Sequence, residues 1–208
     1  MERSEQAIEH CQRVIDVCRA TGQGAVLMVT FTAQVWSLLR MGRLDEAEDT
    51  INAAIEAGRL APHLFLSVAI GQLSLVSTYK GDYDAAVRAG EDCVRLARSA
   101  DPGLIPGMAG LYQAIPLIEI GEAQRARDIV LAMSAGNAHL QTSRSGYTTG
   151  YEVLTRAEIA LGDLGAAHDW ATRAATAAPP GELAGESAFA QRALAAVALA
   201  RGEAAQAA

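Results

Sequence analysis

Aromatic residues and lysine are scarce in this sequence. Phe, Trp and Tyr together make up 5% of the 208 residues, and Lys80 is the only lysine among 17 basic residues. Strands favour aromatic and β-branched residues, whereas alanine, which dominates the apolar residues here, is the strongest helix former. The composition therefore favours closely packed helices over a sheet.

Cysteine and long apolar runs are also scarce. Cys11, Cys18 and Cys93 are the only cysteines and form no CxxC pair, which argues against a disulfide framework and indicates a reducing compartment. No apolar run approaches the roughly 18 residues that span a membrane. The charged N-terminus MERSEQAIEHCQ lacks the apolar stretch of a signal peptide. We therefore expect a cytoplasmic protein that contacts no membrane. The net charge of −7 also predicts no general affinity for nucleic acid.

A short motif recurs along the chain at nearly constant spacing. GRLDEA, GDYDAA, GEAQRA, GDLGAA and GEAAQA begin at Gly42, Gly81, Gly121, Gly162 and Gly202, in steps of 39, 40, 41 and 40 residues. An earlier half-copy places Ala7 another 40 residues before Ala47. A fixed period of this size is typical of helical repeat arrays.

Each part of the motif has a physical role between two helices. The glycine can adopt the left-handed conformation that ends the first helix of a pair, here called helix A. The acidic residue that often follows, such as Asp82 or Asp163, suits the positive N-terminus of the second helix, helix B. We expect the next residue, Leu44, Tyr83 or Leu164, to anchor helix B by burial. The alanine three residues later is small enough for the two helices to approach closely.

Breaks between the repeats complete the helix pattern. Prolines 62, 102, 179 and 180 and the polar run 137–146 interrupt the apolar periodicity, which predicts about ten helices in antiparallel pairs. The longest polar connection, residues 136–151, could be a functional loop or ordinary polar linkage.

The Gly-x-[Leu/Tyr]-x-x-Ala turn resembles the tetratricopeptide repeat, over the whole chain. The resemblance implies an all-α fold, a right-handed superhelix of antiparallel helix pairs, although the period of about 40 residues exceeds the usual 34. Residues 35–58 and 155–175 are similar to the repeat array of MalT-like, ATP-dependent LuxR-family transcription regulators. Such regulators would carry an ATPase module before the array and a helix-turn-helix after it, and neither sequence pattern occurs here. We expect residues 1–208 to form a single array that is a fragment of a larger protein.

No sequence pattern for catalysis or metal binding is present. His10, His63, His139 and His168 are scattered, and the sequence contains no HExxH, GxSxG or GxGxxG. These motifs would indicate a metal site, a serine nucleophile and a dinucleotide site. We therefore predict a protein that is not an enzyme and holds neither a cofactor nor a metal.

The resemblance also implies a binding groove, because helices A line the inner surface of tetratricopeptide arrays. The candidate residues at these positions are Trp36, Arg40, Tyr79, Glu119, Glu152 and Arg156. Aromatic rings and arginine would suit a sugar, a peptide or an aromatic metabolite. Alternatively, Trp36 and Tyr79 fill gaps between neighbouring repeats.

Two functions fit these features. The first is the ligand-sensing or interaction domain of a LuxR/MalT-like regulator, with a small-molecule inducer, a peptide or a protein in the groove. The second is a self-standing adaptor that binds a peptide or protein there. The apolar faces of the first and last helices, near Val14 and Leu199, also predict self-association through the terminal helices.

Overall fold

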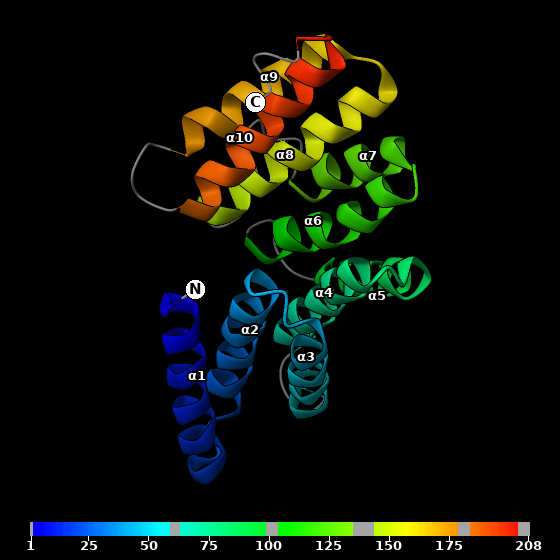
Figure 1. Cartoon of the computed structure of the whole chain (residues 1–208). Helices are drawn as coiled ribbons and strands as arrows, with labels where there is room; N and C mark the ends of the chain where they lie inside the picture. The colour runs from blue at the N-terminus through cyan, green and yellow to red at the C-terminus, as the bar shows by residue number, and fades with distance from the viewer. Residues whose placement is uncertain (1, 59–62, 99–103, 135–143, 179–183, 204–208) are drawn as a thin grey trace. The chain divides into compact units, whose positions relative to one another are not determined.

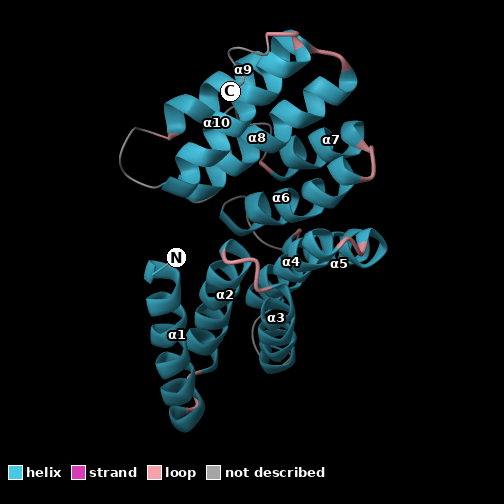
Figure 2. Ribbon diagram, in the orientation of Figure 1, coloured by secondary structure: helices cyan, strands magenta, loops and turns pink. Residues whose placement is uncertain are grey.

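The computed structural model describes residues 2–58, 63–98, 104–134, 144–178 and 184–203, and within them the chain is entirely helical (Figures 1 and 2). Ten helices follow one another: α1 (Glu2–Thr21), α2 (Gly24–Arg40), α3 (Leu44–Gly58), α4 (His63–Lys80), α5 (Tyr83–Ala97), α6 (Leu104–Glu119), α7 (Ala123–Met133), α8 (Arg144–Leu161), α9 (Leu164–Ala177) and α10 (Ala184–Ala200). The predicted all-α class is confirmed.

The helices alternate between the two predicted types. Helices α2, α4, α6, α8 and α10 are A helices, and the odd-numbered helices are B helices. The chain forms two compact units, Met1–Ala100 and Asp101–Ala208, called unit 1 and unit 2. Within each unit an A helix packs against the B helix before it and the B helix after it, and neighbouring A helices also pack together. Each unit therefore has the stacked helix pairs of a tetratricopeptide-like repeat.

Glycine ends the A helices as the motif predicts. The five motif glycines have φ between +70° and +84°, in the left-handed region. At Gly81 the backbone N–H donates to the Thr78 carbonyl at 3.0 Å, and the following Asp82 N–H donates to the Ser77 carbonyl at 3.0 Å. These two bonds make up a Schellman motif, which satisfies carbonyls that the end of a helix would leave unpaired. The same pair of bonds recurs at Gly42, Gly121, Gly162 and Gly202.

The residue after the glycine caps helix B only where it is aspartate. The carboxylate of Asp82 accepts the Ala85 N–H at 3.0 Å, and that of Asp163 accepts the Ala166 N–H at 2.9 Å. Glu122 stands at the same position of α7 but makes no such bond. Its longer side chain instead pairs with Arg125. The capping geometry thus requires the shorter carboxylate.

The alanines of the motif form the centre of the helix packing. Ala47, Ala86, Ala126 and Ala167 are all fully buried. In unit 1 the approach is close enough for the buried Ser74 hydroxyl of α4 to donate to the Ala86 carbonyl of α5 at 2.8 Å. The expected anchor before the alanine is weaker. Leu44 and Leu164 are only half-buried, and the expectation for Tyr83 is wrong because this side chain, on the first residue of α5, is 39% exposed.

Polar contacts join successive repeats of unit 1. Lys80, at the end of α4, pairs with Asp45 at 2.7 Å and Glu48 at 2.6 Å, both on α3. The lysine lowers the pKa of the Asp45 carboxyl through a hydrogen bond and charge attraction. Nearer the chain's start, Arg43 pairs with Glu5 of α1 at 3.2 Å. The chain's only lysine therefore lies at a contact between two repeats.

The polar connection 136–151 differs from its predicted form. Helix α8 begins at Arg144, so residues 144–151 are helical and do not form a loop. Thr148 is fully buried and Tyr151 is 5% exposed. The preceding residues, 135–143, lie outside the described part of the chain. Polar composition was a poor guide here because two threonines of α8, Thr148 and Thr155, are fully buried.

Candidate functional site

The predicted groove residues lie on A helices of both units. Trp36 and Arg40 belong to α2 and Tyr79 to α4, all in unit 1, whereas Glu119, Glu152 and Arg156 belong to α6 and α8 in unit 2. Trp36 is half-buried, Arg40 is exposed, and Tyr79 is 52% exposed. Trp36 and Tyr79 each have a polar or ring interaction within the chain. A role of these three residues in binding a ligand stays a prediction.

In unit 2 the candidates form ion pairs between neighbouring A helices. Arg156 of α8 donates to Glu119 of α6 at 2.8 Å, and Arg192 of α10 donates to Glu152 of α8 at 2.5 Å. The Glu152 side chain is 4% exposed, whereas that of Arg192 is 58% exposed. The Arg192 guanidinium also lies 5.4 Å from the centre of the Phe189 ring. Two of the three predicted residues here are therefore bonded to each other, and the third is bonded to the next helix.

A third ion pair joins α8 to the preceding helix, α7. Arg127 of α7 reaches Glu158 at 3.4 Å, and the Glu158 side chain is only 7% exposed. Helix α8 thus carries two nearly buried carboxylates, Glu152 and Glu158, each with one arginine from a neighbouring helix. Burying a carboxylate is tolerated only with such partners.

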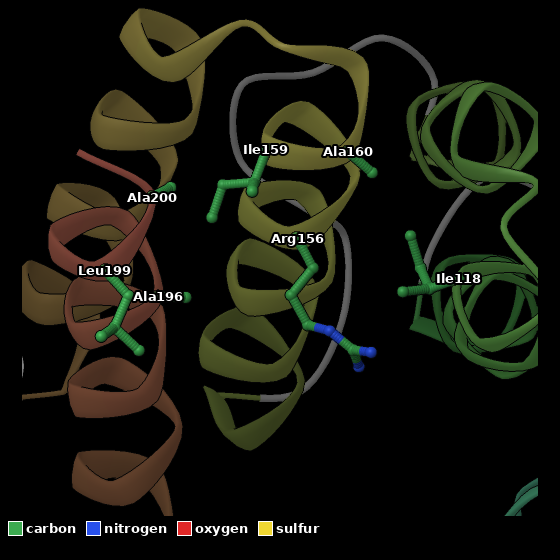
Figure 3. A pocket seen from close by; sticks show the side chains of 7 residues that line it. All are labelled: Ile118, Arg156, Ile159, Ala160, Ala196, Leu199 and Ala200. Carbon is green, nitrogen blue, oxygen red and sulfur yellow. The ribbon is translucent and has the colours of Figure 1, made fainter. Parts of the chain in front are cut away.

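A shallow hollow opens on the A-helix face of unit 2 (Figure 3). Its volume is about 580 Å³, and its lining comes from the C-terminal halves of three A helices: Ile118 of α6, Arg156, Ile159 and Ala160 of α8, and Ala196, Leu199 and Ala200 of α10. Arg156 is the only charged residue of the lining. In Figure 3 its guanidinium extends from α8 toward Ile118, whereas Ile159 points toward α10. The surface can therefore contact an apolar group and place one guanidinium beside it.

Exposed apolar side chains also lie at the ends of the helices that line this hollow. In the described part of unit 2, the large apolar residues that remain exposed are Ile120 (40%), Leu161 (39%) and Leu199 (62%). Each lies one to three residues before a motif glycine, at the end of an A helix. Because α6, α8 and α10 are neighbours, the three side chains lie along one edge of the unit.

The residues predicted from the sequence include Arg156 but not the apolar lining of this hollow. Ile118, Ile159 and Leu199 are apolar residues inside predicted helices, each three residues before a motif glycine, so they look like core residues. Their position in the sequence could have indicated them, because each lies in the last turn of helix A, shortly before the motif glycine.

Metal-binding and membrane-spanning features are absent from the described residues. No three of His, Cys, Asp and Glu gather there as a metal-binding group. No helix in the same residues combines the length and hydrophobicity that crossing a bilayer requires.

The comparisons with known proteins identify the fold through structure alone. Neither the family models nor the curated protein sequences match this chain. Among solved structures it is similar to BtubC (BKLC) from P. vanneervenii, with a TM-score of 0.68 and 17% identity over 98% of this chain and 86% of that chain. A tetratricopeptide repeat protein from Parabacteroides merdae aligns over 100% of this chain and 90% of its own, with 14% identity and a TM-score of 0.43. The stacked helix pairs and their glycine turns, described above, make the fold tetratricopeptide-like. At these identities the likeness concerns the fold and not the ligand.

Proposed function

We propose that this chain is a non-enzymatic protein-interaction module that binds a peptide or protein segment on the A-helix face of unit 2. The observation that carries the proposal is the apolar hollow with its single arginine, continued by exposed Ile120, Leu161 and Leu199. Interfaces combine a desolvated apolar centre with arginine and a polar rim. The ion pairs between α6, α8 and α10 support this role because they hold the three lining helices together before a partner arrives.

Selection from a library of random 16-residue peptides displayed on phage tests this function. Peptides enriched on the immobilised chain would be synthesised, labelled and titrated by fluorescence anisotropy against the wild type, Arg156→Ala and Leu199→Gln. We expect saturable binding that weakens at least tenfold in Leu199→Gln, about 1.4 kcal/mol, and a change in affinity in Arg156→Ala whose sign reports the charge of the partner beside the guanidinium. Val17→Gln is the matched control, because Val17 is 59% exposed in α1 of unit 1 and Leu199 is 62% exposed. If no peptide binds saturably, or if Val17→Gln weakens binding as much, the proposal is wrong.

A small-molecule sensor is the second candidate, and the size of the hollow favours it. About 580 Å³ lies within the usual range for small-molecule sites, and one arginine beside apolar walls could hold an anionic inducer. Binding of an inducer would fit the sensor domain of a LuxR/MalT-like regulator. A free-standing adaptor would instead bind a peptide and no inducer. In a thermal-shift screen, a metabolite at 100 times its dissociation constant would stabilise the fold by about 2.7 kcal/mol. Loss of that shift in Arg156→Ala, with no peptide binding, would favour the sensor over the adaptor.

Self-association through the first helices is a separate part of the proposal. Val14 and Val17 of α1 and Val26 and Val29 of α2 are 40% to 59% exposed, and α1 packs against α2. These four side chains, called the valine patch, are an apolar face of the kind that ends a stacked array.

A further inference from the structure

The exposed apolar residues of this chain lie in two places, the valine patch and the turns of the repeat. Nine large apolar side chains are exposed among the described residues. Four form the valine patch, and the other five all lie within three residues of a motif glycine: Tyr79 and Tyr83 around Gly81, and Ile120, Leu161 and Leu199 before Gly121, Gly162 and Gly202. Scattered exposed apolar residues are ordinary on protein surfaces. These five do not share one position of the repeat, but they gather at the turns between A and B helices, where Leu199 is equivalent to Ile118 and Ile159 and Ile120 is equivalent to Leu161.

In unit 2 these exposed residues and the hollow lie at the C-terminal ends of the same three A helices. Ile120, Leu161 and Leu199 come from three neighbouring A helices, and the hollow lined by Ile118 and Ile159 opens between the same helices. We call these five residues the corner strip, because they stand where each A helix turns into the next B helix. Packed helices lie 8–10 Å apart, so two such steps make the strip roughly 16–20 Å long. At 1.5 Å per residue this equals about 11–13 residues of a bound helix.

The corner strip is negatively charged along its border. Four carboxylates stand beside the turns, on Glu119, Glu122, Asp163 and Glu203, against three guanidiniums, on Arg125, Arg156 and Arg201. Arg125 pairs with Glu122 and Arg156 with Glu119, while Arg201 donates to the Leu164 carbonyl at 3.4 Å. Within the described residues, Asp163 and Glu203 have no ion-pair partner. Three A helices end here and α7 and α9 begin here, so three half-negative helix ends against two half-positive ones add only a small further negative charge.

The few free backbone groups near the strip favour a helical partner over an extended one. An extended segment carries a row of backbone N–H and C=O groups that need partners when they are covered. The strip offers apolar side chains, and the Schellman bonds at Gly121, Gly162 and Gly202 already occupy the nearby amides. A bound helix satisfies its own backbone and needs only side-chain contacts.

We propose that the corner strip binds an amphipathic α-helix of a partner protein, with an apolar stripe flanked by lysine or arginine. The inference rests on the proposed interaction function and names the partner's form and charge. The apolar stripe covers Ile120, Leu161 and Leu199, and the flanking cations face Asp163, Glu203 and the three helix C-termini. Binding therefore weakens as salt screens the charges.

Three 18-residue labelled peptides test this inference on the full chain by fluorescence anisotropy. The first has leucines at positions i, i+3, i+4 and i+7 with lysines elsewhere, the second replaces lysine by glutamate, and the third scrambles the first so that no stripe remains. We expect saturable binding of the first peptide, at least tenfold stronger than of either other peptide and at least tenfold weaker at high salt. The double variant Ile120→Gln/Leu199→Gln should lose at least tenfold in affinity for the first peptide.

The control variant is Tyr83→Gln, which removes an exposed apolar side chain of unit 1 outside both the valine patch and the strip, with 39% exposure against 40% for Ile120. Its affinity should stay within twofold of the wild type, and circular dichroism should show equal helix content in this variant and in Ile120→Gln/Leu199→Gln. Equal binding of the glutamate or the scrambled peptide, or equal losses in these two variants, would overturn the inference. If the phage selection yields peptides that need Leu199 but carry no basic amphipathic pattern, this inference fails and the proposed function stands. If the selection also yields none, both fail.

Discussion

At the scale of single residues, the left-handed glycines make the sharpest prediction. Gly162 has a φ of +84°, and a Cβ added there would meet nothing within 4 Å. Replacing Gly162 by alanine should therefore cost only the left-handed strain, about 1–2 kcal/mol of unfolding free energy. Gly24, the first residue of α2, also has open space around it but no positive φ. Gly24→Ala should leave stability equal or raise it by up to about 1 kcal/mol. Urea unfolding followed by circular dichroism measures both, and equal losses would contradict the conformational explanation.

The three cysteines should differ in reactivity in the folded chain. Cys93 is 1% exposed, and burial raises the pKa of its thiol to about 12. Very little of this thiol would therefore be ionised at pH 8, and the thiolate is the reactive form. Cys18 is also buried, whereas Cys11 is half-buried. We expect a thiol reagent to modify Cys11 first, and Cys18 and Cys93 only after denaturation. Rapid modification of Cys93 at native pH, identified by peptide mass spectrometry, would contradict its burial.

At the scale of helices, the pair between Glu152 and Arg192 should stabilise unit 2. Removing the arginine leaves a carboxylate that is 4% exposed without its cation, so Arg192→Ala should cost about 1–2 kcal/mol of unfolding free energy. Arg95→Ala is the matched control, because the Arg95–Asp92 pair is exposed at 69% and 54%, and such pairs contribute less than about 1 kcal/mol. Adding Glu152→Gln to Arg192→Ala should recover part of the loss. A loss no larger than that of Arg95→Ala would show that solvent already compensates Glu152.

The sequence predicted the helices well because one residue type marks each turn. Gly42, Gly81, Gly121, Gly162 and Gly202 all end an A helix, since few other residues tolerate the left-handed conformation. The ion pairs were harder to predict. Glu152 and Arg192 are one full repeat of 40 residues apart, but Glu119 and Arg156 are 37 residues apart, about one helical turn short of a repeat. Periodicity cannot choose between these offsets, because the stagger of neighbouring helices decides which side chains meet.

At the scale of the whole molecule, the exposed apolar residues at the turns differ from the groove that residue type alone predicts. The expected groove used aromatic and charged residues, and in unit 2 Glu119, Glu152 and Arg156 are engaged with other A helices. The surface that we propose for a partner lies at the ends of α6, α8 and α10, where Ile120, Leu161 and Leu199 stay exposed. Whether an apolar residue in that turn is covered depends on how far the neighbouring helix extends, which a repeat pattern does not encode.

The valine patch makes the last prediction, on the association of the whole chain. Val14, Val17, Val26 and Val29 expose 40% to 59% of their surface on two helices that pack together, and burying apolar area of this kind drives association. We expect sedimentation velocity to show an average mass that rises with protein concentration. The variant Val17→Gln/Val29→Gln should shift that rise to at least tenfold higher concentration. Ile120→Gln/Leu199→Gln should leave the rise unchanged if the patch contacts the same patch of a second copy. A loss of association in that second variant would instead mean that the patch contacts the corner strip of the other copy, a head-to-tail contact that can continue into a chain of molecules.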